Sequence, residues 1–247
     1  MKTLIKYPVI RNAVAGLSLI FALMLPVALT GKTAKAIRSS GLTKAQKVLL
    51  EADSVYTQLH LQSRGLTKVA FVYAWKGYRN LAEKGLIRRP EILSICDFSQ
   101  SSCKKRFYII DLRSGELVLN TFVAHGRNSG GEYARKFSNR PESHQSSLGF
   151  YVTRQTYYGE HGLSLNIDGL EKGINDKAEK RRIVIHGSDY IGPDFLRYNK
   201  FNGRSYGCPA VPLSERDEVI NTIKDGSCLF IYHPTKLYLS RSKVLNM

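Results

Sequence analysis

From residue 92 onward, the apolar residues are gathered in short runs typical of β-strands, and no other feature of the sequence constrains the fold as much. These runs cover residues 92–97, 106–112, 116–124, 148–153, 163–167, 183–186 and 228–233. Arg113-Ser114-Gly115 joins the second run to the third and predicts a hairpin. Because almost no helix separates the runs, a doubly wound parallel sheet is not expected. The pattern predicts a mostly β domain whose long polar loops, 125–147 and 187–207, are functional.

Two helices are predicted before the first strand. Apolar residues recur at steps of three and four over 43–60, and Thr43 is the expected N-cap. A second helix is expected over 67–84, capped by Thr67 and ended by Gly85. Together they predict an N-terminal helical hairpin within a region spanning 37–90, ahead of a main domain at 91–236 and a C-terminal tail at 237–247. A further short helix is predicted from Ser214 to Lys224, with Ser214 as its N-cap.

Residues 1–36 have the composition of a signal peptide. A basic start is followed by an apolar run from Ala13 to Leu29, broken by Pro26, and Ala34-Lys35-Ala36 is a small-x-small cleavage site. An uncleaved membrane anchor is the alternative, because the run approaches the ~20 residues that a transmembrane helix needs. We expect an exported protein located in the periplasm or cell envelope.

The formal net charge of +17 indicates an anionic partner. Nucleic acid is not expected, because an exported protein rarely meets it and the sequence carries no basic helix or aromatic-interleaved basic motif. An anionic wall polymer or a membrane surface remains possible, as does a role for the charge in solubility alone. The sequence does not indicate an oligomeric state.

The four cysteines are expected to differ in pairing and burial. Cys96 and Cys103 flank a short polar turn and could form a disulfide in an oxidising compartment, or remain free. Cys228 lies in an apolar run and is expected to be buried and inert. Cys208 follows glycine in a polar loop. The histidines have no metal-ligand spacing, so neither a metal nor another cofactor is expected.

A candidate nucleophile and base stand 22 residues apart. The apolar run 183–185 delivers His186 at its end, with Gly187 and Ser188 after it, and a Gly-rich loop presents Cys208. A thiol is a weak nucleophile until it ionises, and an imidazole can accept its proton and later return it to a leaving amine. Gly207 permits a sharp turn, so the N–H groups of Tyr206, Gly207 and Cys208 can point towards a developing oxyanion.

The same stretch resembles a known family. His186-Gly187-Ser188 followed by Ser205-Tyr206-Gly207-Cys208 resembles the His-Gly-Thr and Ser-His-Gly-Cys signature of L,D-transpeptidases with the YkuD-type catalytic domain. The closer resemblance is to the murein L,D-transpeptidase catalytic domain family, and it extends over about 67–233. It is carried by residues 123–130, 137–139, 146–149, 169–175 and 203–209.

The resemblance implies a β-rich fold of sandwich or barrel type and an enzyme that works as a cysteine acyltransferase on peptidoglycan. In this family the cysteine attacks the bond between the L-centre of meso-diaminopimelate and the terminal D-Ala of a stem tetrapeptide, and an amine then resolves the acyl-enzyme. The histidine is oriented by a backbone carbonyl, whose matching place is Gly187 or Ser188; Asp189 is the alternative. The predicted substrate-binding residues are His125, Arg127, Asn128, Arg204 and Ser205.

Two departures from the wider superfamily concern substrate binding. Tyr206 replaces the usual His, and Ala210 stands where Arg or Asn is usual. Hydrolysis through the same site, as a carboxypeptidase or endopeptidase, and a non-catalytic peptidoglycan-binding domain are therefore kept as alternatives. Sortases combine a distant Arg after the cysteine with a His–Cys gap usually longer than the one found here, and peptidases of the NlpC/P60 type place the cysteine before the histidine.

Overall fold

The seven predicted strands and one that was not predicted, β7, form one mixed, eight-stranded sheet in the computed structural model, which describes residues 41–246. The strands are β1 (Ile92–Asp97), β2 (Phe107–Asp111), β3 (Glu116–Thr121), β4 (Gly149–Gly159), β5 (Gly162–Gly169), β6 (Val184–Ser188), β7 (Ala210–Pro212) and β8 (Cys228–Tyr232). Their order in the sheet is β3-β2-β1-β8-β4-β5-β6-β7. Pairing is antiparallel except for β1 with β8 and β6 with β7. The prediction of a mostly β fold is confirmed, and the predicted export segment 1–36 lies outside the described residues.

The sheet nearly closes on itself. β3 and β7 are its two edges, yet the chain that leaves β3 continues beside β7, where the Ala124 N–H donates to the Ala210 carbonyl at 2.8 Å. A second bridge pairs Gly126 with Ser205. A barrel-like sheet leaves few unpaired edges. Here the closure brings two segments about 80 residues apart in the sequence to one place, beside Cys208.

Both N-terminal helices form where local signals predict them. Helix α1 spans Lys44–Gln58, and Thr43 closes a capping box with Gln46. Helix α2 spans Lys68–Glu83, with Thr67 accepting from the Ala70 N–H. The chain leaves α2 through Gly85, whose φ of +67° suits glycine.

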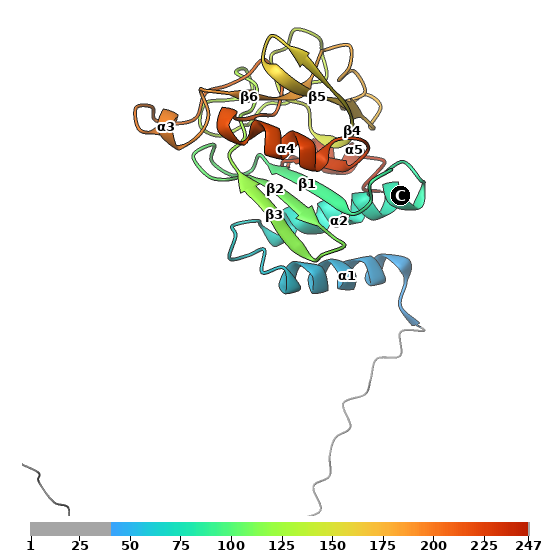
Figure 1. The fold of residues 1–247 in the computed structure, drawn as a ribbon. Helices are drawn as coiled ribbons and strands as arrows, with labels where there is room; N and C mark the ends of the chain where they lie inside the picture. Colours follow the sequence, from blue (N-terminus) through green and yellow to red (C-terminus); the bar gives the residue numbers. More distant parts are fainter. Residues whose placement is uncertain (1–40, 247) are drawn as a thin grey trace, which may run out of the picture. The chain divides into compact units, whose positions relative to one another are not determined.

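The helices share one hydrophobic core with the sheet. α1 packs on α2, and α2 packs against β1 and β8. The approach is close at Gly77, where a Cβ would come within 2.0 Å of the Phe150 ring on β4. In Figure 1, α1 and α2 lie together at one end of this unit and the β4–β5 hairpin lies at the other end. The helical region 42–90 is therefore packed against the strands rather than loosely attached.

The C-terminal third differs from the prediction in two places. The chain passes from β7 directly into the 3-10 helix η2 (Leu213–Glu215) and then α4 (Arg216–Ile223), so Ser214 lies inside η2 and makes no cap hydrogen bond. The predicted tail at 237–247 instead takes part in helix α5 (Lys236–Arg241), and Tyr238, Val244 and Leu245 are buried in the core. The short helix α3 (Pro193–Leu196) lies in the loop after β6.

Among residues 41–246, no helix has the length and apolar character needed to cross a bilayer.

Candidate active site

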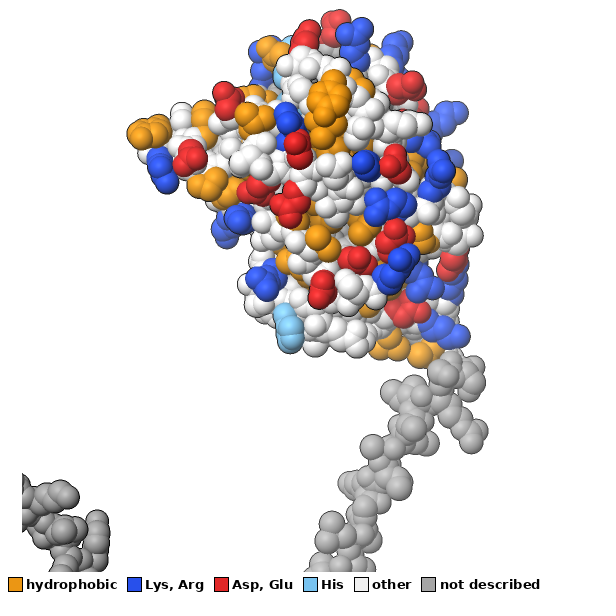
Figure 2. All heavy atoms as spheres, viewed as in Figure 1, with side chains coloured by type: hydrophobic (Ala, Val, Ile, Leu, Met, Phe, Trp, Pro, Cys, Tyr) orange, Lys and Arg blue, Asp and Glu red, His pale blue; other side chains and the backbone are white. Residues whose placement is uncertain are grey.

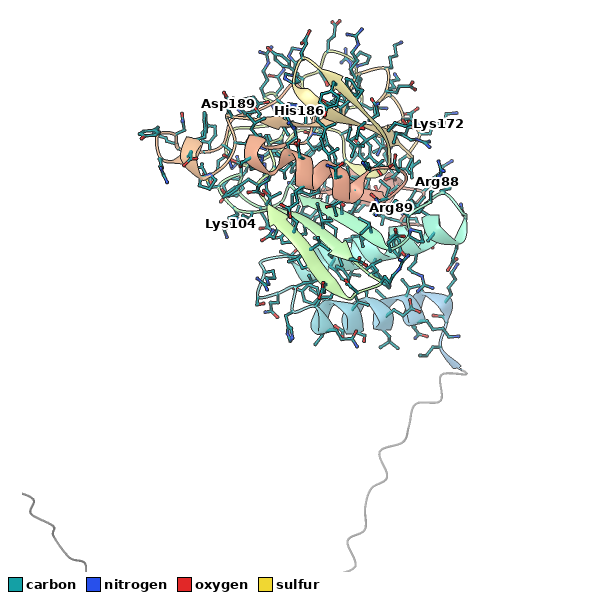
Figure 3. The ribbon with its side chains drawn as sticks, viewed as in Figure 1. Arg88, Arg89, Lys104, Lys172, His186 and Asp189 are labelled. Carbon is teal, nitrogen blue, oxygen red and sulfur yellow. The ribbon has the colours of Figure 1, made fainter. Side chains whose placement is uncertain are left out.

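Strand β6 holds His186 in a fixed orientation. All five residues of β6 are buried, and His186 pairs with Ser164 of β5 on one side and with Ala210 of β7 on the other. The ring is only 2% exposed, and its Nδ1 lies 3.0 Å from the Gly187 carbonyl oxygen. Because a carbonyl only accepts, Nδ1 carries the proton and Nε2 is left as an acceptor. Asp189, the alternative partner, is exposed at the end of the strand (Figure 3).

A tight turn before β7 positions Cys208. Ser205 Oγ donates to the Cys208 carbonyl at 2.6 Å and accepts from the Gly207 N–H at 3.0 Å. Gly207 has a φ of +129°, and a Cβ there would lie 2.8 Å from the Gln145 carbonyl oxygen, so both backbone conformation and space require glycine. The half-buried sulfur accepts from the Val184 N–H at 3.5 Å, which places it against the start of β6.

One predicted role in this turn needs correction, that of Gly207 as an oxyanion donor. The Gly207 N–H is used by Ser205 Oγ, so it does not point freely towards an oxyanion. Ser205 is buried and both of its side-chain hydrogen bonds stay within the turn, so it shapes the loop that carries Cys208. The N–H groups of Tyr206 and Cys208 remain as the candidate oxyanion donors.

Cys208 and His186 line one cavity of about 810 Å³. Of the predicted substrate-binding residues, Arg127, Arg204 and Ser205 also line it. Its volume falls within the range of pockets that bind small molecules and short peptides. All four cysteines of the chain are free, so Cys96 and Cys103 do not form a disulfide here, and Cys228 is fully buried as expected. No group of three or more His, Cys, Asp or Glu side chains within 41–246 is arranged to hold a metal ion.

Burial keeps both groups neutral. Desolvation raises the pKa of the Cys208 thiol above its usual 9.0, although the Val184 N–H and the Arg181 charge oppose this shift. Desolvation also lowers the pKa of His186 below its usual 6.5; the Gly187 carbonyl opposes the shift, and His161 adds to it. At neutral pH the cavity thus holds a neutral thiol and an unprotonated imidazole, so the nucleophile must be generated by proton transfer.

His161 is a residue of this site that the sequence did not reveal. It comes from the turn between β4 and β5, and its ring stacks on that of His186 with centroids 4.2 Å apart and an interplanar angle of 20°. The sequence does not indicate that His161 contacts His186, because the two residues are 25 positions apart and share no local pattern. The register of β4, β5 and β6 alone brings the two rings together.

Arg181 is a second such residue. Its guanidinium donates to the Ser138 and Gln145 carbonyls and to the hydroxyls of Ser143 and Ser147. It therefore ties the loop before β4 to the wall of the cavity, and its charge acts on Cys208. In the sequence it belongs to a basic stretch that is typical of a solvated surface.

His125 and Asn128 do not line the cavity, contrary to the prediction. His125 is 0% exposed, and its Nδ1 accepts from Arg106 Nη2 at 2.8 Å. The chain after β3 pairs with β7 and the loop before it, through bridges at Ala124 and Gly126, and the His125 side chain between them is buried. Asn128 donates to the Ser143 carbonyl and braces the loop.

The burial of His125 predicts an acid-sensitive fold. Desolvation, followed by the charge of Arg106, lowers its pKa to about 3. Between about pH 6.5 and 3 the unfolded chain binds a proton here that the folded chain does not, so stability should fall by about 1.4 kcal/mol per pH unit as pH drops. Urea unfolding across this window measures the slope. His125→Asn should be less stable at pH 7 yet show a shallower slope, and an unchanged slope would contradict the assignment.

Comparison with known proteins identifies one family. Residues 62–232 match the model of a family described as L,D-transpeptidase catalytic domain. No curated protein matches the chain significantly.

Several solved structures are similar to the chain. One is an L,D-transpeptidase from Mycobacterium smegmatis, with 11% identity and a TM-score of 0.36 over 58% of this chain and 59% of that one. Another is L,D-transpeptidase 3 from Mycobacterium tuberculosis, with 10% identity and a TM-score of 0.38 over 58% and 61%. A third is the helical cell shape determining protein Pgp2 from Campylobacter jejuni, with 14% identity and a TM-score of 0.34 over 59% and 48%. The chain spans about three fifths of the length of the two mycobacterial proteins.

Proposed function

Because the chain belongs to the L,D-transpeptidase catalytic domain family, we propose that it cross-links peptidoglycan stem peptides through an acyl-enzyme on Cys208. One observation carries this proposal: Cys208 and His186 line the same cavity, and His186 Nδ1 is held by the Gly187 carbonyl, which leaves Nε2 to take a proton. A buried, neutral imidazole suits a general base working near neutral pH.

In the proposed first step, His186 Nε2 takes the thiol proton while Cys208 Sγ attacks the carbonyl carbon between diaminopimelate and the terminal D-Ala. The tetrahedral oxyanion is stabilised by the backbone N–H groups of Tyr206 and Cys208. His186 then gives its proton to the departing amine of D-Ala, and a thioester on Cys208 remains. The Gly187 carbonyl keeps the ring oriented, and Ser188 extends the strand that holds it.

In the second step, the amine of another stem peptide attacks the thioester, His186 accepts the excess proton, and the thiol is regenerated. Water attacking the same thioester would give carboxypeptidase or endopeptidase activity with the same residues. The reaction does not require a cofactor. A non-catalytic peptidoglycan-binding domain is the alternative that the tests must exclude.

Peptidoglycan lies outside the cytoplasm, so the proposed function agrees with export by the segment 1–36 to the periplasm or cell envelope. In this organisation the helical region 37–90 supports a catalytic domain at 91–236. The predicted contact with an anionic wall polymer or membrane surface remains part of the proposal.

The proposal is tested by incubating the protein with diaminopimelate tetrapeptides and following D-Ala release and intact mass. We expect free D-Ala and a covalent adduct that maps to Cys208, and a carbapenem should acylate the same sulfur. Cys208→Ala should abolish both signals. Cys103→Ala is the matched control, since this partly exposed thiol lies outside the cavity and should leave both unchanged. Binding to sacculi without an adduct or D-Ala would instead identify a binding domain.

A further inference from the structure

The cavity around Cys208 is lined by arginines that have no acidic partner. Arg127, Arg181, Arg182 and Arg204 all line it, and none of them forms an ion pair with any described residue of 41–246. Glu160 is the one acidic residue among those that line it. Such a cavity has a positive potential, which its partly buried walls strengthen.

Several arginines elsewhere on the molecule do have acidic partners. Arg79, Arg89, Arg154 and Arg216 each pair with a nearby carboxylate. On the face seen in Figure 2, basic side chains are interspersed with acidic ones. Unlike these four, the arginines of the cavity have no carboxylate partner among residues 41–246, so their charge is available to a ligand.

Arg127 is held in place by Tyr206. Its guanidinium lies 4.5 Å from the centre of the Tyr206 ring, and the His144 ring contacts the same tyrosine at 4.6 Å between centroids. Tyr206 is 65% exposed, so this large aromatic side chain is not in place to fill the core. Stacking on a ring orients a guanidinium and leaves its N–H donors free in the ring plane.

Arg204 precedes Tyr206 in the same loop, and its side chain is also restrained. It donates from Nη1 to the Gly130 carbonyl at 3.1 Å and lies 5.6 Å from the Phe201 ring. A guanidinium has five N–H donors, so most of its donors remain unused. Ala210, by contrast, is fully buried on β7 and cannot contact a ligand.

We infer that this cavity selects acyl donors in which the side-chain carboxylate of diaminopimelate is free, and that Arg127, held by Tyr206, and Arg204 bind this carboxylate. The planar guanidinium matches a carboxylate with two parallel hydrogen bonds, whereas a carboxamide offers one acceptor and no charge. An amidated stem peptide would leave the arginines desolvated without a counter-charge. The inference rests on the proposed function for the identity of the ligand, but testing it does not require turnover.

The test measures binding of two tetrapeptides to the Cys208→Ala protein by calorimetry. The peptides differ only at the side-chain carboxyl of diaminopimelate, which is free in one and amidated in the other. We expect the free acid to bind at least about tenfold more tightly, as for a charge-assisted hydrogen-bond pair. Adding Arg127→Gln or Arg204→Gln should weaken binding of the acid and leave the amide unchanged. Tyr206→Phe should keep the preference, and Tyr206→Leu should reduce it.

Arg197→Gln is the matched control, because this exposed arginine pairs with Asp194 outside the cavity. It should leave both affinities unchanged. Equal affinities for acid and amide would overturn the inference, as would Arg127→Gln weakening both peptides alike. Failure of the proposed function would look different. The unsubstituted protein would release no D-Ala from either peptide, while the Cys208→Ala protein would still bind the acid more tightly than the amide.

Discussion

Replacing His186 with glutamine should slow acylation of Cys208 at pH 7 by roughly 10²- to 10⁴-fold, the usual contribution of a general base. The thiol needs this base because burial holds its pKa above 9.0, so only a small fraction is ionised at neutral pH. Glutamine keeps a polar side chain of similar size but cannot accept the proton. Single-turnover mass spectrometry with a carbapenem or a tetrapeptide measures the rate.

The pH profile separates a base from a residue with a structural role. In the unsubstituted protein, acylation should fall as pH drops through the pKa of His186, which lies below 6.5, and should be nearly constant from there to about pH 9. In His186→Gln the rate should instead rise about tenfold per pH unit up to the pKa of the thiol. His60→Gln, an exposed histidine outside the cavity, is the control. A variant profile parallel to the original would show that His186 does not act as the base.

His161 should tune this profile. Its charge lowers the pKa of His186, so His161→Gln should raise that pKa and move the acidic limb of acylation to higher pH. The rate at pH 8, above the pKa of His186, should change much less. An acidic limb that stays in place would show that the stacked ring has no influence on the base.

Replacing Arg106 with methionine should have the largest effect on stability, lowering the free energy of unfolding by about 3 kcal/mol or more. Arg106 is fully buried and donates to the Val123 and Gln100 carbonyls and to His125 Nδ1. Methionine fills much of the space but leaves these acceptors without a donor. Denaturant unfolding at pH 7 measures the loss.

Arg113→Met is the matched control, because Arg113 is largely exposed and should change the free energy of unfolding by less than about 0.5 kcal/mol. A similar small effect for Arg106→Met would mean that water or rearrangement satisfies the three acceptors. If the variant fails to fold, Arg106→Lys should remain measurable, since it keeps the charge and loses part of the hydrogen bonding.

The elements that local sequence can specify were predicted well. The Thr43 capping box, the Thr67 cap and Gly85 delimit the two helices, and Gly115, with a φ of +69°, closes the predicted hairpin between β2 and β3. Ser214 is the exception, because the strand β7 before it could not be recognised from three residues. The match to the family model confirms the resemblance to L,D-transpeptidases and the assignment to the acyltransferases. The roles of individual residues remain predictions.

Only some residues of the site could be predicted from the sequence. His186 and Cys208 stood out because a strand end and a glycine turn are short-range patterns. His161, Arg181 and the interior position of His125 could not be foreseen, because each depends on pairings between distant strands.

The amino-acid sequence by itself determined the boundaries of the two N-terminal helices, the strand periodicity and the two reactive residue types, since hydrogen bonds and alternation within a few residues set these features. Only the tertiary structure decided how the near-closed sheet joins Ala124 to Ala210, and hence which side chains meet around Cys208. The physical reason is that strand register and sheet closure are chosen by burial over the whole core. A one-residue shift in register would send each side chain to the opposite face.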